Sequence, residues 1–173
     1  MSMVGFKGQN HPQQTDKRGA LDEVDGRGTH PDTFNPLAER FGGFDLDVAA
    51  APCNAKCARF YTRADDGLAQ DWNGRVWCNP PYRNLVNWVA KAWHEFNIGR
   101  AELIVMLLPA NRVEQGWWQE GVEPYRDRPG SPLKVEFLRG RLLFIRPGQT
   151  EIGPNERPPF GCCLLIWQKE NAS

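Results

Sequence analysis

The sequence predicts an α/β protein with one sheet, mostly parallel, that has an antiparallel C-terminal edge. Three observations favour this fold class. An apolar strand-like segment at 76–78, a helical pattern from residue 84 and a continuous apolar run at 102–110 follow in the order of a parallel βαβ unit. The C-terminal third holds strand-like segments separated by turn signals. With 173 residues, 40% of them hydrophobic, the chain can form one domain with a sizeable core.

The N-terminal part divides into a tail and the first elements of the domain. Residues 1–28 are rich in Gly, Gln, Asp and Lys without apolar periodicity, so we predict a flexible tail followed by a single domain at 29–173. A helix should follow and end at Gly42 and Gly43. Its apolar face is expected to consist of Phe34, Leu37, Ala38 and Phe41.

Residues 44–48 are typical of a short strand that brings Asp45 and Asp47 near its carboxyl end. The small residues Ala49, Ala50 and Ala51 follow it. A second strand, 76–78, leads directly into Asn79, and ligands of such sheets bind beyond the carboxyl ends of the strands. Asp47 and Asn79 are therefore expected to lie at the same edge.

The next segments predict a helix and three further strands. The helix starting at Asn84 should bury one face, and "ELIVMLLPA" at 102–110 should be a strand covered on both sides. Segments 133–138 and 141–145 flank Arg139-Gly140 and predict a tight hairpin, with a last strand at 162–167. The expected buried face of the helix is Val86, Val89, Ala90, Trp93 and Phe96.

The overall composition restricts partners and compartment. The formal charge is zero and the pI near 6.8, so a polyanion partner would require a local basic patch. No apolar run approaches the roughly 20 residues of a membrane span, and the N-terminus has no signal-peptide core. The five cysteines form no pattern of a disulfide framework. We expect free thiols, no membrane partner and a cytoplasmic protein.

The run Asn79-Pro80-Pro81-Tyr82 is the most unusual local feature. Proline cannot donate to a sheet ladder, so regular structure must stop here. The Asn79 side-chain oxygen and the Pro80 carbonyl can each accept a hydrogen bond from one exocyclic amine, such as N6 of adenine. Two such acceptors favour a nitrogen whose lone pair points towards an electrophile. Tyr82 offers a flat face on which a flipped base can stack.

Together with its surroundings, this turn resembles the phage N6-adenine DNA methyltransferase (phage Dam) family. The resemblance covers about residues 29–167. It implies a Rossmann-like fold and methyl transfer from S-adenosylmethionine to adenine N6 in double-stranded DNA, in the host cytoplasm if phage-encoded. The matching segments are "PDTF" at 31–34, "FDLDVAAAPCNAKCARFYT" at 44–62, "DDGLAQDW" at 65–72, "VWCNPPY" at 76–82, "LLPANR" at 107–112 and "FLRGRLLF" at 137–144.

The resemblance and the residues together predict the cofactor contacts. Asp47, with Asp45 beside it, can accept from the cofactor's amino group or ribose hydroxyls, and Ala49 allows close approach where other methyltransferases use glycine. The resemblance further implies that Asp66 accepts from the cofactor's adenine amine. It also implies a cofactor contact at the turn of Pro31, although His30 stands where the family often has Thr.

Arginines are the candidate DNA contacts, because neutralising phosphates provides most of the non-specific affinity. Arg139 and Arg141 flank the tip of the predicted hairpin, a ribbon of the kind that enters the major groove. Arg112 lies in the loop after the apolar strand. No separate recognition domain is visible, so specificity would come from loops of this domain or from a second subunit. We expect a monomer or a homodimer.

Several alternatives remain open at this point. The Asn79–Tyr82 run could be only a turn that ends a strand, and Asp45 and Asp47 could cap a helix. Cys53, Cys57 and His94 suggest zinc, but no second ligand pair follows, so we expect no metal. The same chemistry also serves RNA bases and protein glutamines. A relative that binds DNA without catalysis is a further alternative.

Overall fold

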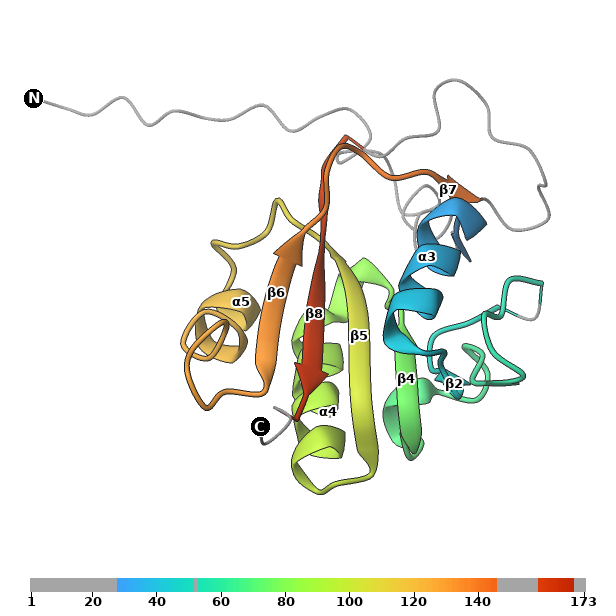
Figure 1. Cartoon of the computed structure of the whole chain (residues 1–173), viewed down its shortest axis with the longest axis horizontal. Coiled ribbons are helices and arrows are strands. Elements are labelled where there is room, and N and C mark those ends of the chain that lie inside the picture. Colours follow the sequence, from blue (N-terminus) through green and yellow to red (C-terminus); the bar gives the residue numbers. More distant parts are fainter. Residues whose placement is uncertain (1–27, 52, 146–158, 170–173) are drawn as a thin grey trace, which may run out of the picture.

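The computed structural model describes residues 28–51, 53–145 and 159–169 (Figure 1). Of the predicted tail, only Gly28 lies within these residues. It belongs to a strand and pairs with Ile145. The strands are β1 (Gly28–Thr29), β2 (Leu46–Asp47), β3 (Arg59–Phe60), β4 (Gly74–Cys78), β5 (Ala101–Pro109), β6 (Leu133–Phe137), β7 (Phe144–Ile145) and β8 (Cys162–Gln168). The helices are α3 (Pro31–Phe41), α4 (Leu85–Asn97) and α5 (Gly116–Gly121), with short 3-10 helices η1 (Gly67–Ala69) and η2 (Tyr82–Asn84).

The main sheet has six strands in the order β3-β2-β4-β5-β8-β6. The strands from β3 to β5 run parallel to one another, and β8 is antiparallel to both β5 and β6. The predicted fold class is confirmed, including the parallel unit β4-α4-β5. All residues of β5 except Glu102 are buried, as expected for a strand covered on both faces.

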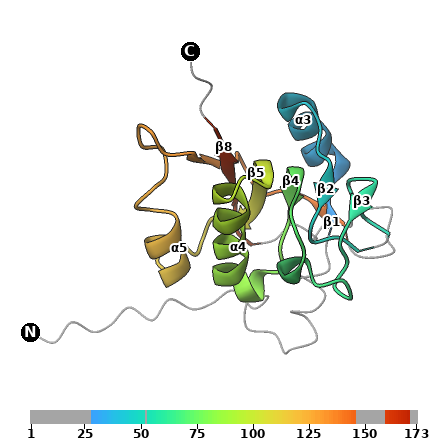
Figure 2. The ribbon, with the colours of Figure 1, turned by 90° about the horizontal axis from the view of Figure 1, so that it is seen from below.

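Helices cover both faces of the sheet, with α4 and α5 on one side and α3 on the other (Figure 2). The α3 helix begins at Pro31, where the imidazole of His30 caps it by accepting from the Asp32 N–H at 3.1 Å. It ends at Gly42, whose φ of 76° is favourable for glycine. Phe34 and Leu37 of α3 belong to the same core cluster as Trp77 of β4. This helix therefore packs over the strand that leads to Asn79.

The buried face of α4 differs from the predicted one. Val89 and Phe96 are buried as expected, whereas Val86 and Ala90 are exposed. The helix is apolar over a wide arc, so spacing alone could not select the face. The face towards the sheet instead consists of Leu85, Trp88, Val89, Ala92, Glu95 and Phe96.

The prediction of a hairpin around Gly140 was wrong. Gly140 does have a φ of 71°, so the chain turns there. However, β6 pairs with β8, and β7 pairs antiparallel with β1 in a separate two-stranded sheet. Phe144 is buried in the core under α3, which draws this segment away from β6. Within the described residues, no two-stranded ribbon therefore carries Arg139 and Arg141.

Several general features follow from the described residues. The five cysteines all lie within them and form no disulfide. No group of three or more His, Cys, Asp or Glu side chains in this part of the chain is arranged to hold a metal ion. None of the helices described is long and apolar enough to cross a membrane.

Candidate active site

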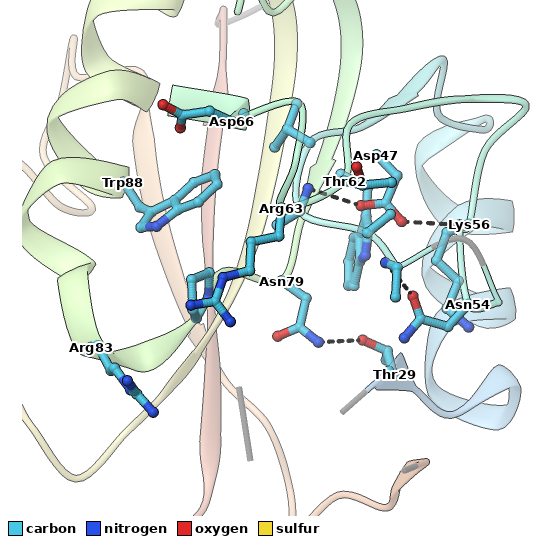
Figure 3. A pocket seen from close by; sticks show the side chains of 18 residues that line it. Thr29, Asp47, Asn54, Lys56, Thr62, Arg63, Asp66, Asn79, Arg83 and Trp88 are labelled. Carbon is cyan, nitrogen blue, oxygen red and sulfur yellow. Dashed lines mark hydrogen bonds between the residues drawn. The ribbon is translucent and has the colours of Figure 1, made fainter. Parts of the chain in front are cut away.

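A cavity of about 390 Å³ opens beyond the carboxyl ends of β2 and β4 (Figure 3). Asp47 is the last residue of β2, and Asn79 directly follows β4. These strands are parallel neighbours, so both side chains reach the same cavity, as predicted. The full lining is Gly28, Thr29, Asp47, Val48, Ala49, Ala50, Ala51, Asn54, Lys56, Thr62, Arg63, Asp66, Gly67, Trp77, Asn79, Pro81, Arg83 and Trp88.

Asp47 is buried and organises the loop that follows β2. Its Oδ2 accepts from the Lys56 N–H at 3.0 Å, and its Oδ1 accepts from the Ala49 N–H at 3.3 Å. Burial raises the pKa of this carboxyl; these backbone hydrogen bonds and the positive charge of Lys56 oppose the shift but do not cancel it. The carboxyl of Asp47, with its raised pKa, therefore forms part of the cavity wall.

The wall next to Asp47 consists of small residues and backbone. Ala49, Ala50 and Ala51 all line the cavity. The Ala51 N–H donates to Oδ1 of Asn54 at 2.8 Å, which closes this loop on itself. Small side chains let a ligand approach the main chain here, although the glycine-rich fingerprint of dinucleotide-binding proteins is absent.

The acidic loop closes the opposite side of the cavity, where Asp66 and Trp88 lie (Figure 3). Asp65 is engaged within the loop, since its Oδ2 accepts from both the N–H and the hydroxyl of Thr62. Asp66 has a φ of 55°, and its Oδ1 accepts from the Leu68 N–H at 3.3 Å. Asp66 is among the residues that line the cavity, and the cofactor contact implied for it by the family resemblance stays a prediction.

Gly67 explains how this loop comes so close to β2. A Cβ at this position would overlap the carbonyl oxygen of Val48. The indole Nε1 of Trp72, which is fully buried, donates to the Gly67 carbonyl at 2.8 Å and fastens the loop from behind. Gly67 and Trp72 thus explain why these two residue types occur in the "DDGLAQDW" segment: the first permits the close approach and the second holds the loop in place.

The side-chain amide of Asn79 is anchored by a residue far away in the sequence. Its Nδ2 donates to Oγ1 of Thr29 at 3.1 Å, and Thr29 belongs to β1 (Figure 3). The donor end of the amide points to Thr29, and Oδ1 is the end of the amide that can accept a hydrogen bond. This orientation is the one that the predicted amine chemistry requires.

The turn that follows is held from two sides. Arg112 Nη1 donates to the Tyr82 carbonyl at 2.8 Å, and its guanidinium carbon lies 5.7 Å from the Tyr82 ring centroid. Phe160 meets the same ring edge to face, with the centroids 5.8 Å apart. The Asn79–Tyr82 turn is therefore braced by the loop after β5 and by the segment before β8.

Three cations line the cavity in addition to the predicted acids. Arg63 and Arg83 are exposed lining residues, and Lys56 lies near Asp47. The Lys56 ammonium lies 5.6 Å from the Phe34 ring centroid. Burial lowers the pKa of Lys56, and Asp47 opposes that shift. The cavity lining therefore combines hydrogen-bond acceptors with positively charged side chains.

The structure gathers only some of the predicted site residues. Those that line the cavity are Asp47, Ala49, Asp66, Asn79 and Pro81, whereas Pro31, Asp45, Pro80 and Tyr82 do not. Asp45 was expected near the carboxyl end of its strand, and that was wrong. It precedes β2, and its Oδ2 accepts from the Arg75 N–H at 2.9 Å, at the opposite end of the sheet. Pro31 occupies the first turn of α3.

Other lining residues were missed by sequence reasoning. Asn54 and Lys56 lie in the "NAKC" segment, so the motif itself was a signal, but no role was predicted for them. Thr29 and Trp88 gave no such signal. Thr29 reaches the cavity only because β1 pairs with β7, and Trp88 only because α4 turns that face inwards.

A comparison with protein families agrees with this arrangement. The model of the family described as DNA N-6-adenine-methyltransferase (Dam) matches residues 21–172. The chain belongs to this family. The Dam-family match includes every segment that forms the cavity, from β1 to α4.

Two phage proteins are among the similar Dam-family relatives. The DNA N-6-adenine-methyltransferase of Escherichia phage T1 is 37% identical over 86 residues, which is 49% of this chain and 35% of the relative. The protein of the same name from Haemophilus phage HP1 is 39% identical over 66 residues, 38% of each chain. The matches thus span little more than a third of these relatives.

Proposed function

We propose that the chain is a DNA adenine N6-methyltransferase that uses S-adenosylmethionine. The observation that carries the proposal is that Asp47 and Asn79, from neighbouring parallel strands, line one cavity. Asp47 would then accept from the cofactor and Asn79 from the target amine, side by side in the same cavity. Membership of the Dam family and the names of the two phage relatives support the same activity.

The cavity fits the proposed cofactor. Its volume of about 390 Å³ falls within the range common for small-molecule sites. Asp47 can accept from the amino group or ribose hydroxyls, Ala49 to Ala51 admit a ligand close to the backbone, and Asp66 can accept from the adenine amine. When bound, S-adenosylmethionine supplies the electrophilic methyl group. The protein residues only hold and orient it.

The target amine would be held by the Asn79-Pro80 pair. Oδ1 of Asn79 and the Pro80 carbonyl accept one hydrogen bond each from the adenine N6 amine, which directs the nitrogen lone pair towards the methyl group. Pro81 has φ −61° and ψ 138°, an extended conformation that continues the rigid Pro80-Pro81 unit. Tyr82, braced by Phe160 and Arg112, provides the face for a flipped base.

Double-stranded DNA is the proposed partner. Arg139 and Arg141 are exposed in the turn after β6, where they can meet phosphates. A target adenine must leave the duplex to reach the cavity, because its N6 is otherwise paired. We propose a monomer or homodimer acting in the cytoplasm, the host's if the chain is phage-encoded.

The first test is the Asn79→Ala variant. Without the side-chain acceptor, the rate of methyl transfer should fall at least about a hundredfold, while cofactor affinity stays close to that of the unchanged protein. Transfer is measured with labelled S-adenosylmethionine and DNA, and affinity by calorimetry. Asn87→Ala, at an exposed position on α4, is the matched control and should keep full activity. Full activity of Asn79→Ala would refute the mechanism.

The acceptor is tested separately. The protein is expressed in a methylation-deficient host, N6-methyladenine is mapped along the DNA, and DNA, RNA and protein pools are incubated with labelled cofactor. Label in DNA alone is the expected result and gives the recognition site as well. Label only in RNA or protein would overturn the DNA assignment. DNA binding without cofactor binding would indicate a relative that lacks catalysis.

A further inference from the structure

We propose that Thr29 is a positioning residue that holds the carboxamide of Asn79 in its productive orientation. The inference rests on the proposed function, since it concerns the residue that would bind the target amine. Its basis is the hydrogen bond from Asn79 Nδ2 to Thr29 Oγ1, 3.1 Å long, at the base of the cavity (Figure 3). Thr29 itself is only 1% exposed.

The hydroxyl is well suited to act as a fixed anchor. Thr29 is paired with Phe144 across the two-stranded sheet of β1 and β7, and Phe144 is buried in the core under α3. A β-branched side chain has few rotamers in such a position, so its oxygen stays in place. The backbone of Asn79 is fixed independently, by β4 before it and Pro80 after it. Two separately supported segments therefore meet in this one hydrogen bond.

The chemical need for an anchor comes from the two unlike ends of an amide. If the Asn79 carboxamide rotated by half a turn, its NH2 group would face the amine of the substrate, and two donors would oppose each other. In the structure the Thr29 hydroxyl accepts from Nδ2, which is the orientation in which Oδ1 is turned away from Thr29 and can face the substrate. A donor amine arriving in the cavity favours the same orientation. Thr29 should thus contribute to the rate rather than to cofactor binding.

The test compares Thr29→Val with Thr29→Ser. Valine keeps the shape and suits a strand, but it removes the acceptor; serine keeps the hydroxyl. The single-turnover rate of Thr29→Val should fall about tenfold or more, with the Kd for S-adenosylmethionine and the KM for DNA nearly unchanged. Thr29→Ser should recover most of that rate. Thr33→Val, the same change on α3, has no such contact and should leave the rate unchanged.

The outcomes separate this inference from the proposed function. If the unchanged protein methylates DNA and Thr29→Val is equally fast, the positioning role is refuted while the function stands. If the unchanged protein methylates nothing, both fail. A loss of rate that serine does not restore, or one that follows a drop in thermal stability, would show a merely structural role. Should Thr29→Val not fold, Thr29→Ala is compared with Thr29→Ser in the same way.

Discussion

Asp47 illustrates how its neighbours set the chemistry of a single side chain. It ends a strand, points into the cavity and accepts two backbone hydrogen bonds, yet burial still raises its pKa. An ordinary surface aspartate would stay ionised at any mildly acidic pH. Asp47 should therefore protonate at a higher pH than usual, and it then loses acceptor capacity just where the cofactor would bind.

This leads to a prediction about pH. Cofactor affinity should be full above the raised pKa of Asp47 and should fall as the pH decreases through it, because the protonated carboxyl accepts fewer hydrogen bonds. Calorimetric titration with S-adenosylmethionine from neutral to about pH 4.5 measures this dependence. Asp47→Asn should bind about tenfold or more weakly and show a flatter profile. Asp71→Asn, outside the cavity, should behave like the unchanged protein; an unchanged profile in Asp47→Asn would contradict the assignment.

The orientation of the Asn79 side chain also depends on its surroundings, through its hydrogen bond to Thr29. The Asn-Pro-Pro-Tyr run is recognisable in isolation, and its position after β4 was predicted. The orientation of its amide was not predictable, because the acceptor that sets it is 50 residues away in the chain. A local motif thus depends on a distant hydroxyl.

The strand β7 shows that a turn can be predicted correctly while the pairing of the strand after it is not. A turn at Gly140 was expected and exists, but the residues after it join β1 instead of returning along β6. This pairing brings Thr29 to the cavity and leaves Arg139 and Arg141 in an exposed turn. The alternative partner could not be recognised beforehand, since β1 has only two residues.

Arg112 in the loop after β5 and Arg139 in the turn after β6 are expected to serve different purposes. Arg112 holds the Tyr82 carbonyl, so Arg112→Gln should reduce the single-turnover rate about tenfold while hardly changing the salt dependence of DNA binding. If Arg139 contacts a phosphate, Arg139→Gln should do the reverse and reduce the slope of log K against log salt by about one. Fluorescence anisotropy over a salt series measures the slope. A reduced slope for Arg112→Gln would instead support its originally predicted contact with DNA.

Over the whole molecule, a buried carboxylate joins the elements behind the cavity. Glu95 of α4 is fully buried and accepts from Lys91 Nζ and Arg100 Nε, each at 2.7 Å, and from the Trp72 N–H at 3.3 Å. Burial alone would raise its pKa, but the hydrogen bonds from Lys91 and Arg100 outweigh burial and lower it. The network links α4 and the start of β5 to the Trp72 segment that supports Gly67.

Glu95 therefore gives a prediction about stability. Glu95→Gln should lower the free energy of unfolding by about 3 kcal/mol, because two cations lose their buried partner. With a folded-state pKa below the unfolded one, Glu95 stabilises the protein above the ordinary glutamate pKa, and this contribution is lost as the pH falls through the lower folded-state value. Urea denaturation at several pH values measures both effects. Glu102→Gln, in an exposed pair with Arg75, should cost at most about 0.5 kcal/mol.

The helix that ends at Gly42, the parallel unit β4-α4-β5 and the meeting of Asp47 with Asn79 followed from the sequence, whereas β1, β3 and α5 were not predicted. The predicted features depend on local patterns: apolar runs, helix-ending glycines, and the rule that parallel strands present their carboxyl ends at one edge. Contacts between distant segments did not follow, among them β1 with β7, Thr29 with Asn79 and Arg112 with Tyr82. Such contacts depend on which of several comparable pairings buries the most apolar surface, and only the folded chain as a whole selects among them.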